Sequence, residues 1–310
     1  MEDSSTFATI ALPLALVLIM GSLGLSLTPG DFRRVFTQPR GVLIGLGNLV
    51  LLSPLLAFGV AEAFGLAAVL AVGLVLLGSS PGGATANLFT HLAKGETALA
   101  VSMTAVSSVL AAIVIPLYLG LAITHFDAPG LTDDVEVIGI SARVFAITVV
   151  PLTIGMWIRR RRTEWARRHE DRAKIIAISA LAIVIVIAVI DEFELIQENF
   201  TTLVFAALAF NVAAMTMSYT ISRVARLTER QATAVALELG IHNGTVAIAV
   251  AALVDTRLAA PAAVYTLPMF INGALFARAM ARRNAAALAQ AEAGAAAAGE
   301  PAAAGAAPRI

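Results

Sequence analysis

Glu238 is an acidic side chain deep inside an apolar segment, in the stretch 234–244. An ionised carboxylate in hydrocarbon is costly unless it is paired, hydrated or bound to a cation. We therefore interpret Glu238 as part of a binding site for a monovalent cation. The alternative is a structural role, in which the carboxyl group is protonated or bonded to Arg143 or to a helix terminus.

Two glycines follow this carboxylate, and they favour local unwinding of the helix. Gly240 and Gly244 lie two and six residues after it. An unwound backbone would offer carbonyl oxygens such as those of Leu239 and Ile241 as ligands. Oxygen ligands with a single carboxylate suit a hard monovalent ion better than a transition metal.

His242 follows Glu238 by four residues. A histidine inside a membrane protein is commonly a core residue with satisfied hydrogen bonds. Its imidazole titrates near pH ~6.5 in isolation, so beside a carboxylate it is also a candidate proton carrier. Both interpretations of His242 stay open at this point.

A second motif interrupts another apolar segment, residues 66–92. Pro81 lacks a backbone N–H, and the two glycines after it carry no Cβ, so the helix should break at 81–84 and restart around Thr85. Such a break survives in hydrocarbon only where protein or a wet cavity supplies hydrogen-bond partners, which favours a binding site. The alternative is a proline kink, which we expect instead at Pro54, Pro116, Pro151 and Pro268.

Side-chain oxygens lie close to this second motif. Asn87 follows the break, and Thr104 lies on the next apolar segment, 98–124, although a membrane threonine alone often bonds its own helix backbone. The restarted helix offers free N–H groups and a positive dipole end to an anion. We therefore expect Thr85, Asn87 and Asn243 to contact an anionic substrate.

Membrane-spanning helices must position these residues. The chain has 310 residues, of which 59% are hydrophobic and 14% charged, with a mean hydropathy of +0.86, which predicts an all-α polytopic membrane protein in the lipid bilayer. The absence of Cys excludes disulfides and thiolate sites. The net charge of +0 by itself says nothing about partners, and we expect no nucleic-acid partner. Nine apolar segments approach or exceed the ~20 residues needed for a span: 7–27, 41–61, 66–92, 98–124, 135–158, 174–191, 199–222, 230–254 and 261–281.

Loop charges predict the orientation of these spans. With nine crossings, all Lys and Arg residues except Arg143 and Arg257 fall on one side, and the loop acids gather mainly on the other. The positive-inside rule then places the N-terminus outside a cell membrane and the C-terminus in the cytoplasm. The final stretch, 285–310, is rich in Ala, Gly, Pro and Glu, and we predict a disordered cytoplasmic tail.

The two interrupted segments are third from the start and second from the end, so they run in opposite directions. That arrangement is typical of inverted-topology repeats, in which broken helices cross near the middle of the bilayer. Nine spans cannot form two repeats of equal size, so we expect one repeat to have one helix fewer than the other.

Taken together, these motifs resemble the bile acid:sodium symporter family. The likeness runs through 73–87 and 90–95, then Thr104, and returns at 238–243, while 24–32 resembles the family's early helix-end signature. The resemblance implies a core domain with two crossed broken helices and a panel domain that moves against it, in a nine-helix form. We expect a transporter domain over 1–284, with a core near 66–124 and 199–254 and a panel made of the remaining helices.

The resemblance also implies ion ligands. Asn87, Thr104 and Glu238 match the family's sodium ligands, and the backbones of Leu239 and Ile241 match carbonyl ligands of a second ion. This chain departs from the family at four positions where a hydroxyl or amide is expected. Because these oxygens are missing, we expect transport to be coupled to one ion or to be coupled more weakly. His242 is a candidate site for the ion or for a proton. The departures are Ala86, Ala100, His242 and Leu49, the last next to Asn48.

These observations favour a secondary active transporter, not an enzyme, that couples sodium to the symport of a small organic anion by alternating access. The alternative is a proton-coupled or facilitated organic-acid carrier with degraded sodium sites. An intramembrane enzyme would need Ser79 or Ser80 beside a histidine base, without the usual nucleophile motif. A signalling or scaffold protein would have no reason for two broken helices. Bile salts, keto acids, pantoate-like acids and sulfated compounds all stay open as substrates.

Overall fold

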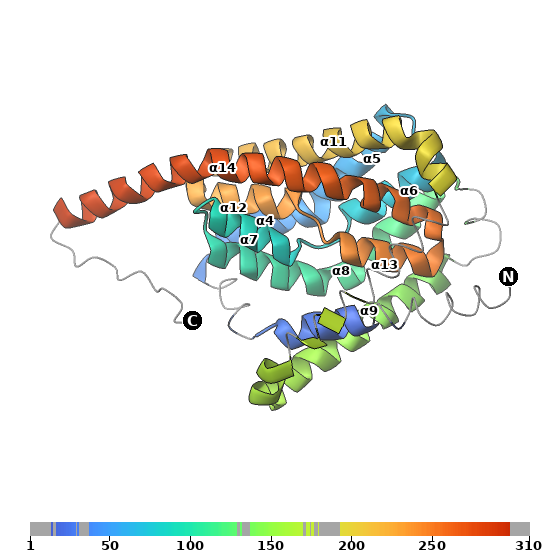
Figure 1. The fold of residues 1–310 in the computed structure, drawn as a ribbon, viewed down its shortest axis with the longest axis horizontal. Coiled ribbons are helices and arrows are strands. Elements are labelled where there is room, and N and C mark those ends of the chain that lie inside the picture. Colours follow the sequence, from blue (N-terminus) through green and yellow to red (C-terminus); the bar gives the residue numbers. More distant parts are fainter. Residues whose placement is uncertain are drawn as a thin grey trace.

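The protein is helical throughout its described residues, as the apolar segments predict (Figure 1). The computed structural model describes residues 14, 17–28, 30, 37–128, 131, 137–169, 172, 173, 175, 176, 179 and 193–297. The helices cover Val17–Ser26, α4 (Pro39–Gly47), the π-helix η1 (Asn48–Leu52), α5 (Ser53–Ala63), α6 (Ala68–Gly78), α7 (Ala84–Leu92), α8 (Thr97–Phe126), α9 (Val137–Arg161), α11 (Phe193–Val224), α12 (Glu229–Gly240), α13 (Gly244–Val254), the 3-10 helix η2 (Thr256–Ala259) and α14 (Ala260–Ala297).

Several of these helices have the length and hydropathy of membrane spans. Within the described residues, four stretches are long and apolar enough to cross a bilayer, and the shorter apolar helices Val17–Ser26, α6 and α13 accompany them. The predicted segment 174–191 lies almost entirely outside the described residues. The count of nine spans and the inverted repeat therefore stay predictions. The four stretches are Pro39–Ala63, Thr97–Phe126, Gln197–Val224 and Thr256–Ala286.

The isolated prolines bend or widen helices without ending them. Before Pro54 the backbone forms the π-helix η1, in which the Ser53 N–H donates to the Asn48 carbonyl. This wider turn accommodates a proline that cannot donate to the preceding turn. Pro116, Pro151 and Pro268 lie inside α8, α9 and α14, so none of the four prolines breaks a span.

The Pro-Gly-Gly segment, in contrast, separates α6 from α7. The break is longer than predicted and begins at Ser79, because α6 ends at Gly78. The hydroxyl groups of Ser79 and Ser80 donate to the carbonyls of Val75 (2.7 Å) and Leu77 (2.6 Å), which satisfies the end of α6 without another helical turn. The second predicted break separates α12 from α13 at Gly240 and Gly244, as expected from the two glycines.

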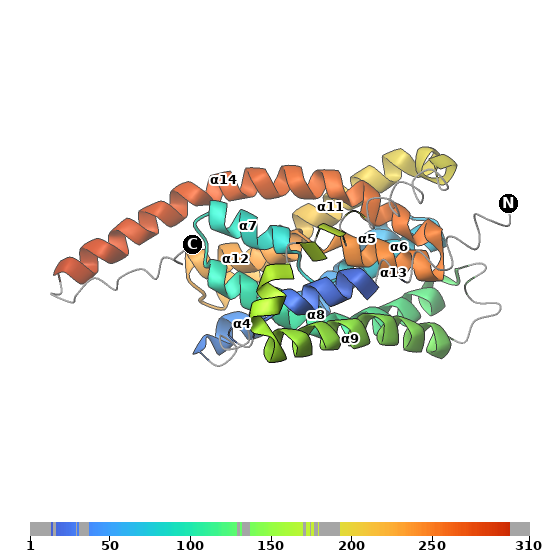
Figure 2. The ribbon, with the colours of Figure 1, turned by 60° about the horizontal axis from the view of Figure 1, so that its bottom comes forward.

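The broken helices form the centre of the molecule. Figures 1 and 2 show α6, α7, α12 and α13 lying between α14 on one side and α8 on the other. Every residue of α6 from Val69 to Gly78 is buried, because its sequence is apolar on all faces. Phe210 of α11 and Tyr265 of α14 are the largest fully buried side chains around this centre.

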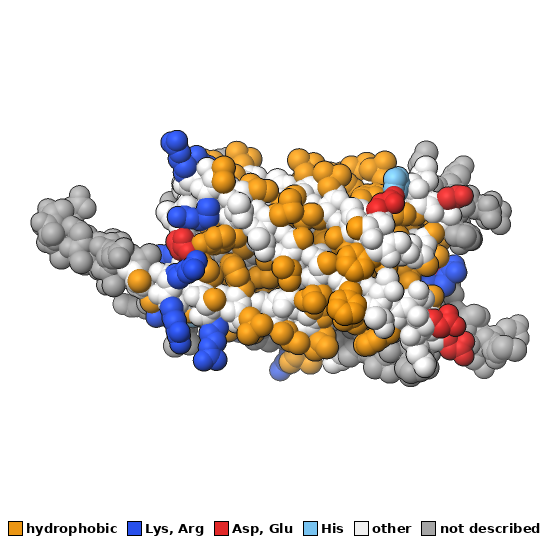
Figure 3. Space-filling view, turned by 90° about the horizontal axis from the view of Figure 1, so that it is seen from above, with side chains coloured by type: hydrophobic (Ala, Val, Ile, Leu, Met, Phe, Trp, Pro, Cys, Tyr) orange, Lys and Arg blue, Asp and Glu red, His pale blue; other side chains and the backbone are white. Residues whose placement is uncertain are grey.

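Charged side chains gather mainly at the two ends of the surface seen in Figure 3. Lys and Arg cluster at one end, Asp and Glu at the other, and a broad hydrophobic band separates them. This distribution supports the predicted partition of loop charges, because a membrane protein exposes apolar side chains to lipid and charges to water.

The final helix is longer than predicted. We expected disorder from residue 285, but α14 continues as a helix to Ala297, and Figures 1 and 2 show its end projecting beyond the other helices. The prediction is wrong for 285–297 because alanine has the highest intrinsic helix propensity and needs no packing partner to favour a helix. Residues 298–310 lie outside the described residues.

Candidate functional site

The two breaks meet and hydrogen bond to each other. Gly82 and His242 form an isolated antiparallel bridge. The Gly83 N–H donates to the Ile241 carbonyl (3.0 Å), and the Asn243 N–H donates to the Pro81 carbonyl (2.8 Å). Backbone groups that the breaks release are thus satisfied by the opposite break, which is how an irregular backbone survives in an apolar environment. The two interrupted segments therefore meet at their breaks, at a place that we call the crossing.

Three of the predicted ligands come together beside this crossing. Thr104 Oγ1 on α8 lies 2.7 Å from Glu238 Oε1 on α12 and 3.3 Å from Asn87 Oδ1 on α7. The Glu238 residue is 1% exposed. A Cβ at Gly82 would overlap the Glu238 carboxylate, so only glycine allows the first break to approach this acid so closely. Arg143, considered above as a partner for Glu238, has no described side chain.

Acceptors outnumber protons in this cluster. The Thr104 hydroxyl has one proton but lies within hydrogen-bond distance of three acceptors, since the Ala100 carbonyl is also 3.0 Å away. Glu238 Oε2 is buried and has no hydrogen-bond partner. An unpartnered buried carboxylate oxygen is expensive, so the cluster requires a cation or an additional proton.

The donor types indicate which cation would fit. The cluster offers carboxylate, hydroxyl and amide oxygens, and within the described residues no group of three or more His, Cys, Asp or Glu side chains comes close enough to hold a metal. Oxygen ligands with one negative charge suit a hard monovalent ion. The arrangement of Asn87, Thr104 and Glu238 therefore fits sodium better than a transition metal.

The two predicted carbonyl ligands lie in the second break and at the end of α12. The Ile241 carbonyl accepts the Gly83 N–H, so it already pairs the two breaks, although a carbonyl oxygen has a second lone pair. The Leu239 side chain is fully buried and packs with Leu49 and Ala214. These contacts position the backbone of the second break.

His242 has partners other than Glu238. Its Nε2 lies 3.1 Å from Ser53 Oγ on α5, and its Nδ1 lies 3.3 Å from the Ser80 carbonyl. The ring stacks on Phe210, with centroids 5.7 Å apart and an angle of 6° between the planes. Both ring nitrogens are thus occupied by the protein, and the residue connects the second break to α5 and to the first break.

Asn48, beside the other position where the resemblance expects an amide ligand, is also engaged elsewhere. Its Nδ2 donates to Ser218 Oγ (2.9 Å) on α11, and the Ser218 hydroxyl lies 3.3 Å from the Val235 carbonyl. Asn48 is buried. His242 and Asn48 lie at or beside the positions where the resemblance expects amide ligands for a second ion. Both side chains instead link helices through hydrogen bonds.

The predicted substrate contacts lie at two helix N-termini. Asn243 is the N-cap of α13, where its Oδ1 accepts the Val246 N–H at 3.3 Å, a role that its place before a restarting helix could have indicated. Thr85, in the first turn of α7, is half-buried. The N-cap of α7 is Gly83, and no side chain caps that end, which leaves it suited to an anion.

A further buried network was missed by the sequence reasoning. The Asn211 Nδ2 and the Tyr265 hydroxyl both donate to the Gly240 carbonyl, at 2.7 and 2.8 Å, and the Asn272 Nδ2 donates to Asn211 Oδ1 at 2.9 Å. These bonds fix the end of α12 just after Glu238. Asparagines inside apolar segments need partners, so Asn211 and Asn272 were a usable signal.

Known proteins resemble this chain over most of its length. Residues 13–199 match the family described as the Sodium Bile acid symporter family. The uncharacterized sodium-dependent transporter YocS of Bacillus subtilis is 28% identical over 274 residues, which are 88% of this chain and 83% of that protein. The rabbit (Oryctolagus cuniculus) ileal sodium/bile acid cotransporter is 28% identical over 77% of this chain and 68% of its own length.

A rice (Oryza sativa subsp. japonica) protein named probable sodium/metabolite cotransporter BASS2, chloroplastic, is 26% identical over 84% of this chain, which spans 61% of the rice protein. These relatives are named as transporters and cotransporters, not as enzymes. The family match covers more than half of the chain and includes the first break with Asn87 and Thr104. The chain therefore belongs to the sodium bile acid symporter family of membrane transporters.

Proposed function

We propose that this protein is a secondary active transporter that couples one sodium ion to the symport of a small organic anion by alternating access. The observation that carries the proposal is the surplus of acceptors around Thr104, together with the unpartnered Glu238 oxygen, beside the crossing of the two breaks. A bound cation would neutralise the carboxylate and draw together Asn87, Thr104 and Glu238, which lie on three different helices. Its binding would thereby stabilise one arrangement of those helices.

The stoichiometry of one ion rests on the partners of His242 and Asn48. His242 has no side-chain oxygen and both of its ring nitrogens face protein groups, and the Asn48 amide nitrogen donates to Ser218. Among these two side chains, a second ion would therefore find only the Asn48 amide oxygen as a ligand. We therefore propose a single sodium ion at Glu238.

The anionic substrate would lie at the restarted helices. The N-termini of α7 and α13 both begin at the crossing, and their positive dipole ends favour an anion there. Thr85 and Asn87 lie in the first turns of α7, and the Asn243 cap uses only its Oδ1, which leaves the amide nitrogen for a substrate. The cation and anion sites then share Asn87, which would couple their occupancy.

Alternating access needs two bodies within a transporter domain over 1–284. Val17–Ser26 and α9 form a layer beside the broken helices, and we propose this layer as part of the moving panel (Figure 2). The packing of α5 and α14 on α6 and α11 supports assigning them to the core, instead of to the panel as the resemblance implied. We further propose a location in the cell membrane with the N-terminus outside and the C-terminus in the cytoplasm.

Transport by purified protein in proteoliposomes tests this proposal. A screen of organic anions by thermal unfolding, with sodium and with potassium, first identifies a ligand, because ligands that bind the folded state raise its melting temperature. Uptake of that ligand should then require a sodium gradient and show a sodium Hill coefficient near one. Equal uptake in sodium and potassium at fixed pH would exclude sodium coupling.

Proton coupling is the second candidate, because a proton on Glu238 would also relieve the acceptor surplus. It predicts uptake driven by a pH gradient in potassium alone, with no added sodium. The same proteoliposomes separate the two candidates when the sodium and proton gradients are imposed one at a time.

A further inference from the structure

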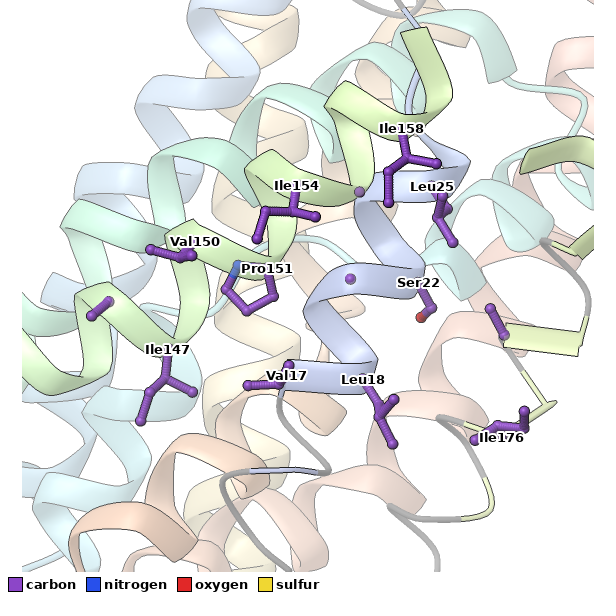
Figure 4. A pocket seen from close by; sticks show the side chains of 14 residues that line it. Val17, Leu18, Ser22, Leu25, Ile147, Val150, Pro151, Ile154, Ile158 and Ile176 are labelled. Atoms are coloured by element: carbon purple, nitrogen blue, oxygen red, sulfur yellow. The ribbon is translucent and has the colours of Figure 1, made fainter. Parts of the chain in front are cut away.

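A cavity of about 630 Å³ lies between the helix Val17–Ser26 and α9 (Figure 4). None of the residues that line it belongs to the two breaks. We call it the α9 groove. Its third wall includes Ala173 and Ile176. Its lining is apolar apart from Ser22, whose hydroxyl donates to the Ile19 carbonyl of its own helix at 2.9 Å. The α9 groove therefore favours an apolar ligand, because it offers no hydrogen-bond partner to a polar one.

Glycines explain why the two helices touch at one place and leave a groove beside it. A Cβ at Gly155 would lie 2.9 Å from the Gly24 Cα, so the backbones are in contact there. From Ile147 to Ile158, α9 rises about 16 Å along the α9 groove. One leaflet of hydrocarbon is about 15 Å deep, half of a ~30 Å core. The length of the α9 groove thus matches one lipid acyl chain in one leaflet.

One end of the α9 groove is strongly basic. The last residue of α9 that lines the groove is Ile158, and Arg159–Arg162 follow directly in the chain. The Arg161 guanidinium lies 6.0 Å from the centre of the Trp157 ring, and Trp157 is 59% exposed, as is typical of a tryptophan at a membrane interface. Residues 159–172 contain seven arginines against three acids, Glu164, Glu170 and Asp171, so the stretch keeps a net positive charge.

We propose that the α9 groove binds one acyl chain of an anionic phospholipid whose phosphate is held by Arg160, Arg161 and Arg162. An apolar groove of leaflet depth fits the chain, and the basic end fits the headgroup because guanidinium pairs with phosphate through two parallel hydrogen bonds. Basic sites between membrane helices on the cytoplasmic side bind such headgroups. Among the described residues, the lipid contacts Val17–Ser26, α9, Ala173 and Ile176, so it stabilises these segments against one another. The proposed cation and substrate residues take no part.

Native mass spectrometry of the full-length protein released from detergent tests the headgroup. We expect one equivalent of phosphatidylglycerol to stay bound with at least about tenfold preference over phosphatidylcholine of the same chains. The triple variant Arg160→Gln, Arg161→Gln, Arg162→Gln should lose that preference. The matched control is Arg278→Gln, Arg282→Gln, Arg283→Gln on α14, which lies on the opposite side of the molecule and should keep the preference (Figure 1).

Filling the α9 groove tests the acyl chain. Ile154→Trp should abolish retention of phosphatidylglycerol, and Ala146→Phe is a second filling variant in case the first fails to fold. Leu117→Trp, on the exposed face of α8, is the control and should retain the lipid. Equal binding of the two lipids to the unaltered protein, or full retention by a folded groove-filled variant, would overturn the proposal and leave only non-specific surrounding lipid. None of these readouts depends on sodium or on transport.

Discussion

Glu238 and His242 lie four residues apart, the first in the last turn of α12 and the second in the break that follows it, and both are buried, with 1% and 2% of their surfaces exposed. Their hydrogen bonding differs. Both nitrogens of His242 face partners on α5 and the first break, whereas one oxygen of Glu238 has none. Burial alone therefore does not identify a binding site in this protein. What distinguishes Glu238 from His242 is the surplus of acceptors over protons around its carboxylate, which a bound cation or proton would relieve.

The residues opposite each side chain explain the difference. Gly82, which has no side chain, lies close to Oε1 of Glu238, and the second oxygen of this carboxylate is buried without a hydrogen-bond partner. Ser53, the Ser80 carbonyl and the Phe210 ring face His242 and enclose it. The first break thus approaches Glu238 closely without a side chain that could donate to it, whereas it supplies a hydrogen-bond partner to His242.

Removing the Glu238 charge should have the largest effect on cation binding. At an effective dielectric constant of about 20, two unit charges ~4 Å apart attract by about 4 kcal/mol, so Glu238→Gln should weaken sodium affinity by roughly a thousandfold. Sodium-dependent shifts of the melting temperature measure the affinity. Glu229→Gln, at the start of the same helix, is the control. A Glu238→Gln protein that keeps the sodium response would remove the carboxylate from the proposed site.

Closing the space above the carboxylate should have the next largest effect. A Cβ at Gly82 overlaps Glu238 Oε1, and overpacking of this kind costs about 1–3 kcal/mol, so Gly82→Ala should weaken sodium binding by about 10- to 100-fold. Gly83→Ala is a close control, because a Cβ there would meet the His242 carbonyl at 3.5 Å, the Ile241 carbonyl at 3.6 Å and the Asn243 Cα at 3.7 Å, which are all ordinary contacts. Both variants need the same sodium titration, and equal effects would contradict the role of Gly82.

Loss of the Thr104 hydroxyl should have a moderate effect. Thr104→Val keeps the shape of the side chain but removes one proposed ligand and the hydrogen bond to Glu238, a combined loss of about 1–2 kcal/mol. We expect sodium affinity to fall by about tenfold. Thr104→Ser restores the oxygen and should recover most of the affinity. Uptake assays at several sodium concentrations provide the measurement, and failure of Ser to rescue would indicate a packing role.

Changing His242 should have the smallest effect on cation binding. His242→Gln disturbs the contacts to Ser53 and Ser80, and buried groups left unsatisfied cost about 1–3 kcal/mol, so the melting temperature without sodium should fall. Sodium affinity should change by less than about threefold. A large loss of sodium affinity would mean that His242 is a ligand after all.

Local sequence patterns were sufficient to locate the cluster. Asn87 and Glu238 were predicted from polar types beside the two breaks, and Thr104 was predicted from a hydroxyl on the next apolar segment. All three lie together in the structure. His242 was harder to assign, since neighbouring positions in an unwound segment can face different directions. Its proximity to Glu238 along the chain indicated a shared role that the hydrogen bonds to Ser53 and Ser80 do not support.

The amino-acid sequence by itself determined the helical membrane class and the approximate positions of the two breaks. Hydropathy and the backbone preferences of proline and glycine depend on only a few neighbouring residues, so they can be read from the sequence. It did not determine which oxygen atoms would lack partners. That depends on segments far apart in the chain, such as Gly82, Thr104 and Glu238, approaching within hydrogen-bond distance. Only the tertiary structure decides such approaches, since the number of acceptors around one proton is a property of packing between helices.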